Sequence, residues 1–186
     1  MNGAANVAGP IDFFVVTGGP GSGKSTLIAA LAAQGFVTMP EAGRAVIRAQ
    51  MAEGGGALPW ADRAAFAEAM LREDMKSYRD AQERDGPVFF DRGVPDVVGY
   101  LRLSGLAVSA HMRKAAMDLR YNVRAFIAPP WREIFHQDAE RKQDFAEAVR
   151  THDAMTAVYR ELGYELIALP CVPVEDRARF VRDTAI

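Results

Sequence analysis

The chain has 186 residues, of which 22 are Lys or Arg and 24 are Asp or Glu, giving a formal charge of −2. This balance lacks the basic excess that nucleic-acid or anionic-membrane partners require, so we expect a small-molecule partner instead. The single cysteine, Cys171, excludes an internal disulfide, and no run approaches the ~20 apolar residues of a membrane span, which together predict a soluble, cytoplasmic protein.

The chain opens on a short leader and continues as one domain. Residues 1–10 are mostly small and end in a proline, and we expect them to be disordered. Residues 11–186 suit a single domain, because a chain of this length buries about 70% of its unfolded surface without disulfides or metals. The apolar run at residues 11–17 predicts a first strand that is buried on both faces of a parallel sheet.

The segment after this strand carries the most specific motif of the chain. It matches the phosphate-binding pattern G-x-x-x-x-G-K-[ST], with its fixed positions at Gly18, Gly23, Lys24 and Ser25. Glycines let successive N–H groups face one concavity, and the helix that follows, expected to end near residue 34, adds the positive end of its dipole. Lys24 would reach the β- and γ-phosphates, and the Ser25 hydroxyl would bind Mg²⁺. The residues expected to hold the nucleotide are Gly18, Gly19, Pro20, Gly21, Ser22, Gly23, Lys24, Ser25 and Thr26.

A short strand predicted at residues 36–39 delivers Glu41 to the same edge of the sheet, because parallel strands place their carboxyl ends together. A carboxylate at this edge could act as the base for a bound hydroxyl. The alternative is an acid in the first turn of a helix at residues 41–51, where the helix dipole favours it. Arg44 would either contact a phosphate or pair with Glu41.

Three glycines at residues 54–56 separate this helix from a second one at residues 59–84. They form either a plain linker or a hinge for a flap that covers a substrate. The second helix repeats large apolar residues at helical spacing, which favours a core face over a share of a ligand pocket. These residues are Trp60, Phe66, Met70, Leu71, Met75 and Tyr78.

Residues 88–91 read as an apolar strand that ends in an acid, Asp91. This is the form of the second nucleotide-binding acid of phosphate-loop proteins, which holds Mg²⁺ directly or through water. The alternative is an Asp that caps the next helix. Arg92 follows directly and would bring a fixed positive charge to the same edge.

Residues 131–144 are strongly charged, and a short lid is predicted at about residues 129–144 that excludes water and lays arginines across the transferring phosphoryl group. Arg141 is the first candidate and Arg132 the second, and the alternative is a solvated helix. The loop at residues 171–173 is expected to border the nucleotide base. The remaining elements are predicted as helices at 95–104, 109–120 and 145–162, strands at 123–128 and 164–169, and a closing helix from residue 174.

Four segments carry a resemblance to a known family: residues 18–26 (GGPGSGKST), 41–44 (EAGR), 89–93 (FFDRG) and 159–167 (YRELGYELI). Together they resemble the AAA-type predicted ATPases, a phosphate-loop family related to the nicotinamide riboside kinase domain of the bacterial NAD regulator and, more distantly, to deoxynucleoside and thymidylate kinases. The resemblance implies an α/β, three-layer P-loop NTPase sandwich, with a five-stranded parallel sheet of order 2-3-1-4-5, helices on both faces and a short lid. It also implies that Glu41 is the acceptor's base and that Asp91 and Arg92 contact Mg²⁺ and phosphate.

These observations favour an ATP- and Mg²⁺-dependent phosphotransferase that acts on a small hydroxyl-bearing acceptor, such as a nucleoside or ribosyl compound. Its catalytic residues would be Lys24, Glu41, Asp91, Arg92 and Arg141, with Ser25 and Asp91 holding the metal. The rival is a regulatory nucleotide switch of the ATPase or GTPase type, which needs no acceptor base. A DNA-handling ATPase is a weaker interpretation, because the near-neutral charge does not suit phosphate-backbone binding. The nature of the acceptor, the choice of ATP or GTP, and a monomer or a homodimer stay open.

Overall fold

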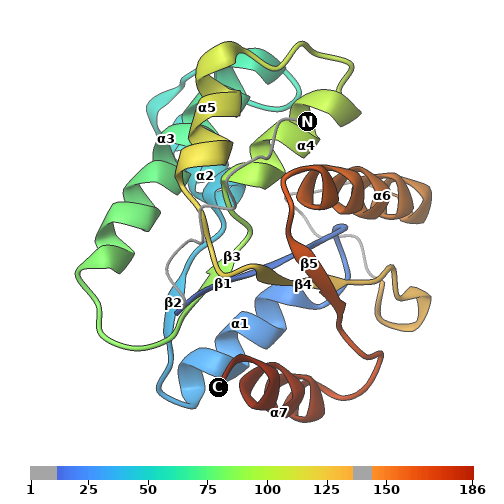
Figure 1. Ribbon diagram of the computed structural model, residues 1–186. Helices are drawn as coiled ribbons and strands as arrows, with labels where there is room; N and C mark the ends of the chain where they lie inside the picture. Colours follow the sequence, from blue (N-terminus) through green and yellow to red (C-terminus); the bar gives the residue numbers. More distant parts are fainter. Residues whose placement is uncertain (1–11, 136–143) are drawn as a thin grey trace, which may run out of the picture.

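The computed structural model describes residues 12–135 and 144–186, and it has an α/β sandwich architecture (Figure 1). Five parallel strands form one sheet in the order β2-β3-β1-β4-β5, so the predicted strand order is confirmed. The strands are β1 (Phe13–Gly18), β2 (Val37–Met39), β3 (Val88–Asp91), β4 (Arg124–Ala128) and β5 (Glu165–Ala168). All five carboxyl ends meet at one edge, which is where open α/β sheets bind ligands.

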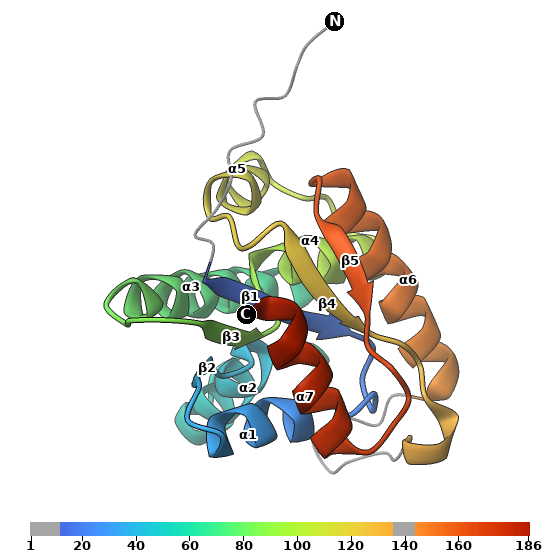
Figure 2. The same cartoon turned by 60° about the horizontal axis from the view of Figure 1, so that its bottom comes forward.

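Helices cover both faces of the sheet, with α1 and α7 on one face and α3, α4 and α6 on the other (Figures 1 and 2). The helices are α1 (Lys24–Ala33), α2 (Ala42–Glu53), α3 (Arg63–Gln82), α4 (Val94–Leu103), α5 (Ala110–Asp118), α6 (Phe145–Glu161) and α7 (Val174–Ala185), with a 3₁₀ turn η1 (Arg132–Ile134). Within the described residues, no helix is both long and apolar enough to cross a bilayer.

The central strand β1 is buried along its whole length and feeds two separate cores. Phe13 and Val15 pack into the core under α3 and α6, whereas Phe14 and Val16 pack into the core under α1 and α7. Successive side chains of a strand point to opposite faces, and a strand covered on both sides is therefore apolar nearly throughout. This packing fixes β1, and with it the loop that follows the strand.

Trp60 departs from the predicted core stripe. The helix α3 begins at Arg63, where the Asp62 side chain accepts a hydrogen bond from the backbone N–H of Ala65 at 2.9 Å. Trp60 therefore precedes the helix and is 61% exposed, so the prediction that it belongs to the core is wrong. The N-cap decides the outcome, because a residue before the cap does not follow the helical repeat.

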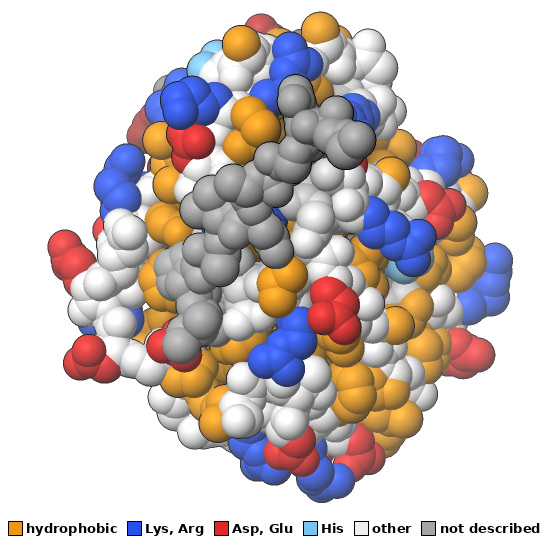
Figure 3. Space-filling model, in the orientation of Figure 1, with side chains coloured by type: hydrophobic (Ala, Val, Ile, Leu, Met, Phe, Trp, Pro, Cys, Tyr) orange, Lys and Arg blue, Asp and Glu red, His pale blue; other side chains and the backbone are white. Residues whose placement is uncertain are grey.

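The surface carries charges of both signs. On the face shown in Figure 3, Lys and Arg side chains are interspersed with Asp and Glu side chains. This mixture agrees with the formal charge of −2.

Candidate functional site

The loop between β1 and α1 is held by close backbone approaches from two other elements. Gly18 has φ of 128°, and a Cβ there would lie closer than 3.0 Å to the carbonyl oxygen of Ala128 at the end of β4. A Cβ on Gly19 would lie equally close to the carbonyl oxygen of Ala148 in α6. Larger residues would thus force the loop away from β4 and α6, and glycine is required at both positions.

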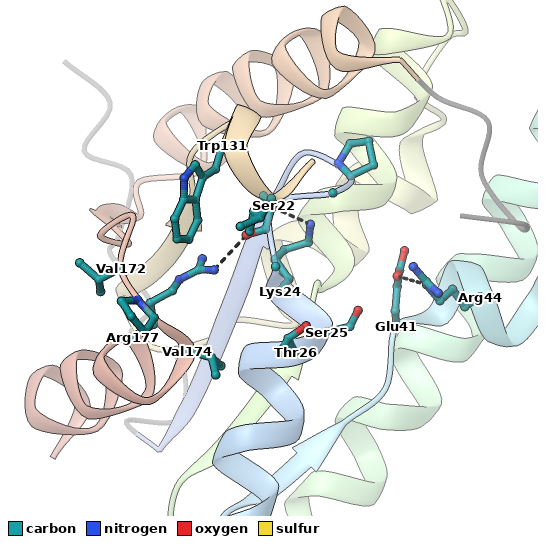
Figure 4. A pocket seen from close by; sticks show the side chains of 15 residues that line it. Ser22, Lys24, Ser25, Thr26, Glu41, Arg44, Trp131, Val172, Val174 and Arg177 are labelled. Atoms are coloured by element: carbon teal, nitrogen blue, oxygen red, sulfur yellow. Dashed lines mark hydrogen bonds and ion pairs between the residues drawn. The ribbon is translucent and has the colours of Figure 1, made fainter. Parts of the chain in front are cut away.

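Lys24 is buried inside this loop and folds back over it (Figure 4). Its Nζ donates hydrogen bonds to the carbonyl oxygen of Gly19 and, at 3.2 Å, to Oγ of Ser22. The Ser22 hydroxyl in turn donates to the Gly19 carbonyl at 2.8 Å. The ammonium group is therefore positioned within the concavity where the motif predicts phosphates.

The loop forms one wall of a cavity of about 390 Å³ (Figure 4). The opposite wall comes from Trp131, after β4, and from residues 172–174 and 177 at the start of α7. Val172 and Pro173 belong to the loop that is predicted to border the nucleotide base. The cavity has the size and the phosphate loop that a nucleotide requires.

Arg177 was missed by the sequence reasoning, because it is one of three arginines in the amphipathic helix α7 and no motif sets it apart. Its Nη1 donates to the carbonyl oxygen of Ser22 at 3.0 Å, and its Cζ lies 5.8 Å from the ring centroid of Trp131. Among the described residues, its Nε has no hydrogen-bond partner. Burial lowers the pKa of Arg177. A polar donor is thus held at the wall of the nucleotide-sized cavity.

Asp91, at the end of β3, faces the start of α1. Oγ of Ser25 donates to its Oδ2 at 3.1 Å, whereas Oδ1 is buried without a hydrogen-bond partner in the part of the chain that is described. Burial raises the pKa of Asp91, Glu41 raises it further, and Lys24 and Arg92 oppose this rise. The alternative role as a helix cap does not fit the structure, because the N-cap of α4 is Gly93.

Glu41 is the N-cap residue of α2, but its side chain does not cap the helix. The buried carboxylate instead accepts from two arginines, with Arg92 Nε 3.2 Å from Oε1 and Arg44 Nε 3.2 Å from Oε2. Arg44 therefore pairs with Glu41, which was one of its two predicted partners. This pairing fixes the orientation of the carboxylate.

Arg92 links Glu41 to a second carboxylate. Its Nη1 donates to Oδ1 of Asp96 at 2.9 Å, and its side chain is only 12% exposed. Its φ of 70° makes it the one described non-glycine residue with a positive φ, a conformation that costs energy and concentrates at functional sites. Burial lowers the pKa of Arg92, but Glu41, Asp96 and Asp91 together outweigh burial and raise it.

Asp96 is the buried anchor of this arrangement. It accepts from Thr17 Oγ1 at 2.6 Å, from the Tyr159 hydroxyl at 2.7 Å and from the backbone N–H of Gly93 at 3.2 Å, besides Arg92. Sequence reasoning placed Asp96 only at a helix start. The spacing of four residues from Arg92 was the available signal, but the partners from β1 and α6 lie too far along the chain to be read from it.

A second cavity of about 540 Å³ adjoins the first, since Pro20 and Glu41 line both. It lies among α2, α3, α4 and α6, and apolar side chains form much of its wall, including those of Phe66, Met70 and Met155. The exposed Trp60 also borders it. Glu41 is thus the point where the cavity lined by the phosphate-binding loop meets a second cavity with both apolar and charged walls.

Of the two arginines predicted for the lid, only Arg132 lies within the described residues. Arg132 lies in the 3₁₀ turn with its Cζ 4.1 Å from the ring centroid of Phe145, and it does not line the nucleotide-sized cavity. Arg141 lies outside the described residues. The structure therefore brings Lys24, Ser25, Glu41, Asp91 and Arg92 together at one sheet edge, whereas Arg132 packs on Phe145 and does not line the cavity.

Comparison with known proteins agrees with this architecture. A family model described as "AAA domain" matches residues 13–177. No curated protein matches the chain. Thymidylate kinase from Candida albicans superposes with a TM-score of 0.68 at 10% identity, covering 95% of this chain and 91% of that one.

Two further solved structures share the fold. Deoxyadenosine kinase from M. mycoides has a TM-score of 0.66 at 11% identity and covers 92% of this chain and 97% of its own. Shikimate kinase from Acinetobacter baumannii has a TM-score of 0.53 at 15% identity and covers 92% of this chain and 90% of its own. At these identities the likeness establishes the fold and leaves the substrate undetermined.

Proposed function

The chain belongs to the AAA domain family, as its sequence resemblance predicted, and from that premise we propose that it is an ATP-dependent phosphotransferase. It would transfer the γ-phosphoryl group of ATP to the hydroxyl of a small acceptor. The observation that carries this proposal is the meeting of two cavities at Glu41. A protein that only binds nucleotide has no need for a second cavity that opens onto the phosphate loop.

ATP would bind in the cavity that the phosphate loop lines. Loop N–H groups and the start of α1 would bind the phosphates, and Lys24 would exchange its bonds to Gly19 and Ser22 for phosphate oxygens. The adenine would lie beside Trp131 and Arg177, where an aromatic face and a cationic group suit a flat ring.

Ser25 and Asp91 would hold Mg²⁺. The fit rests on the buried, unpartnered Oδ1 of Asp91 and on the hydroxyl beside it, since both are the hard oxygen donors that Mg²⁺ prefers. Among the described residues there is no group of three or more His, Cys, Asp or Glu side chains that could hold a metal ion. A Mg²⁺ that keeps water and phosphate ligands does not need one. The ion would neutralise charge on the β- and γ-phosphate oxygens.

The transfer would proceed through the acceptor hydroxyl at Glu41. Its oxygen forms a bond to the γ-phosphorus while the bond from that phosphorus to the β–γ bridging oxygen breaks, and ADP leaves with the bond's electrons. The hydroxyl proton passes to Glu41, which Arg44 and Arg92 hold in place. Lys24 and Arg92, with Arg141 from the predicted lid at residues 129–144, would offset charge on the transferring group.

A nucleotide switch is the second candidate, and the pairing of Glu41 with two arginines favours it, because such a pair can be purely structural. A metabolite screen coupled to ADP release separates the two functions. We expect one hydroxyl-bearing acceptor to accelerate ADP release strongly, and Glu41→Gln to abolish that gain while ATP affinity is retained. If no acceptor acts and Glu41→Gln leaves basal hydrolysis unchanged, the protein is a switch.

A further inference from the structure

Two polar side chains in the second cavity have no hydrogen-bond partner among residues 12–135 and 144–186. Asp74 comes from α3 and Thr151 from α6, and both line the cavity that Glu41 borders. We propose that they recognise the acceptor away from its reacting hydroxyl, and that this part of the acceptor is a flat nitrogen-containing ring with an amino group. The inference rests on the proposed function, because it concerns the acceptor of that reaction.

Asp74 is 6% exposed, and no hydrogen bond or ion pair joins it to another described residue. Its surroundings add negative charge from Asp96, Glu41 and Glu73, and the nearby cation Arg92 already serves Glu41 and Asp96. Burial is the main cause of the raised pKa of Asp74, and the neighbouring carboxylates raise this pKa further. A buried carboxyl group without a hydrogen-bond partner is unfavourable. A ligand that donates a hydrogen bond to Asp74 would therefore bind favourably in this cavity.

Thr151 gives an independent indication from a different helix. Threonines inside helices often donate back to a carbonyl one turn earlier, but the buried Oγ1 of Thr151 has no hydrogen-bond partner among the described residues. Its hydroxyl can accept from an amino group or donate to a ring nitrogen or carbonyl. Two unpartnered polar groups from two helices thus face one cavity.

The wall of the cavity selects the shape of the ligand. Phe66 and Tyr100 pack edge to face with ring centroids 5.4 Å apart, and Met70 and Met155 add further apolar surface. Apolar, aromatic walls suit a flat ring better than a chain of hydroxyl groups. A volume of about 540 Å³ accommodates such a ring together with a hydroxyl-bearing arm that reaches Glu41.

The charge around Asp74 selects against acids. An acceptor with a carboxylate at this position would face the carboxylates of Asp96 and Glu41, and like charges in a buried site repel. The two cations among the described residues of the wall are already engaged, Arg92 with those carboxylates and Arg63 with the carbonyl oxygen of Pro59. An amino group on the ring instead donates to Asp74. This combination favours a nucleoside-like compound over a hydroxy acid.

The test compares acceptors in matched pairs. Acceptor-dependent ADP release is measured with nucleosides that differ by amino and keto groups on the ring, cytidine against uridine and adenosine against inosine, and with hydroxy acids of similar size. We expect the parent protein to use an amino-bearing nucleoside and to reject the acids. Asp74→Asn should lower kcat/KM for that nucleoside by about tenfold to a hundredfold, mainly through KM, with KM for ATP unchanged.

The selectivity distinguishes recognition from a structural role. An amide can donate to a keto group, so Asp74→Asn should also shift the ratio of kcat/KM towards the keto-bearing partner, which a packing defect would not do. Asp80→Asn is the matched control, since it makes the same exchange at an exposed position of α3. If Asp74→Asn does not fold, as judged by circular dichroism, the isosteric Thr151→Val variant replaces it in the test. The measurement is again the ratio of kcat/KM between the amino-bearing and the keto-bearing nucleoside.

Two kinds of result would overturn the inference. They differ in whether the proposed phosphotransferase function is refuted as well. A hydroxy acid as the substrate, or an Asp74→Asn variant with the selectivity of Asp80→Asn, would refute the role of Asp74 while the phosphotransferase stands. If calorimetry shows that ATP binds with Mg²⁺ but no acceptor accelerates ADP release, the proposed function fails, and this inference fails with it.

Discussion

The two cavities that meet at Glu41 are built in opposite ways. The phosphate-loop wall of the nucleotide-sized cavity is one continuous segment whose polar groups bind each other, as Lys24 and Ser22 do with the carbonyl of Gly19. The second cavity is assembled from four helices, and Asp74 and Thr151 in it find no partner among the described residues. The proposed phosphate site is therefore encoded locally in this chain, whereas the proposed choice of acceptor would depend on contacts between distant elements.

The largest effect is expected on stability, when the hydrogen bonds that Asp96 accepts from other elements are lost. Asp96→Ala removes four hydrogen bonds and leaves Arg92 buried with one carboxylate fewer, so we expect the free energy of unfolding to fall by about 3–5 kcal/mol. Urea denaturation measures this change. Tyr159→Phe removes one of those bonds and should cost only about 1 kcal/mol. Equal losses in the two variants would mean that Asp96 is not an anchor.

The next largest effect is expected in the phosphate-binding loop. Lys24→Ala should reduce phosphoryl transfer by a factor that corresponds to roughly 3 kcal/mol of transition-state stabilisation, because the charge on the transferring group loses a prepositioned cation. ADP release measures the loss. Lys76→Ala, at an exposed position of α3, is the control. A Lys24→Ala variant that turns over ATP at the parent rate would contradict the assignment.

A smaller effect follows from the close approach of the loop to α6. Gly19→Ala would place a methyl group against the carbonyl of Ala148, so we expect a loss of about 1–3 kcal/mol in the free energy of unfolding and weaker ATP binding. Gly56→Ala is the matched control, because nothing lies within 4 Å of a Cβ there and its φ is not positive. Similar stabilities for the two variants would show that the loop has room to move.

The smallest effect is pH-dependent and concerns the second cavity. The pKa of Asp74 is raised in the folded protein, so the folded state holds the proton more tightly than the unfolded state, and stability is lost as pH rises through the folded pKa. Asp74→Asn removes this loss. We expect the variant to be more stable than the parent by roughly 1 kcal/mol at pH 8, with the gain shrinking as pH falls towards 4. Thermal unfolding across this range checks it, and a constant difference would contradict it.

The same division explains what the sequence could predict. The phosphate loop and Asp91 follow local patterns, such as a glycine-rich turn after an apolar run, and the structure places both at one edge. The strand order was implied by the family resemblance, and the structure confirms it. Asp96 and Arg177 were missed because their partners are far along the chain. Asp96 binds Thr17 across 79 residues, and Arg177 binds Ser22 across 155. Such contacts depend on how the helices pack, which no local pattern specifies.

The positions of the two tryptophans have a practical consequence. Trp131 lines the cavity proposed for the nucleotide, and Trp60 borders the cavity proposed for the acceptor. Each of the two cavities thus has its own intrinsic fluorophore. With Trp60→Phe and Trp131→Phe, stopped-flow emission can follow the arrival of ATP and of the second substrate independently, and so reveal the order in which they load.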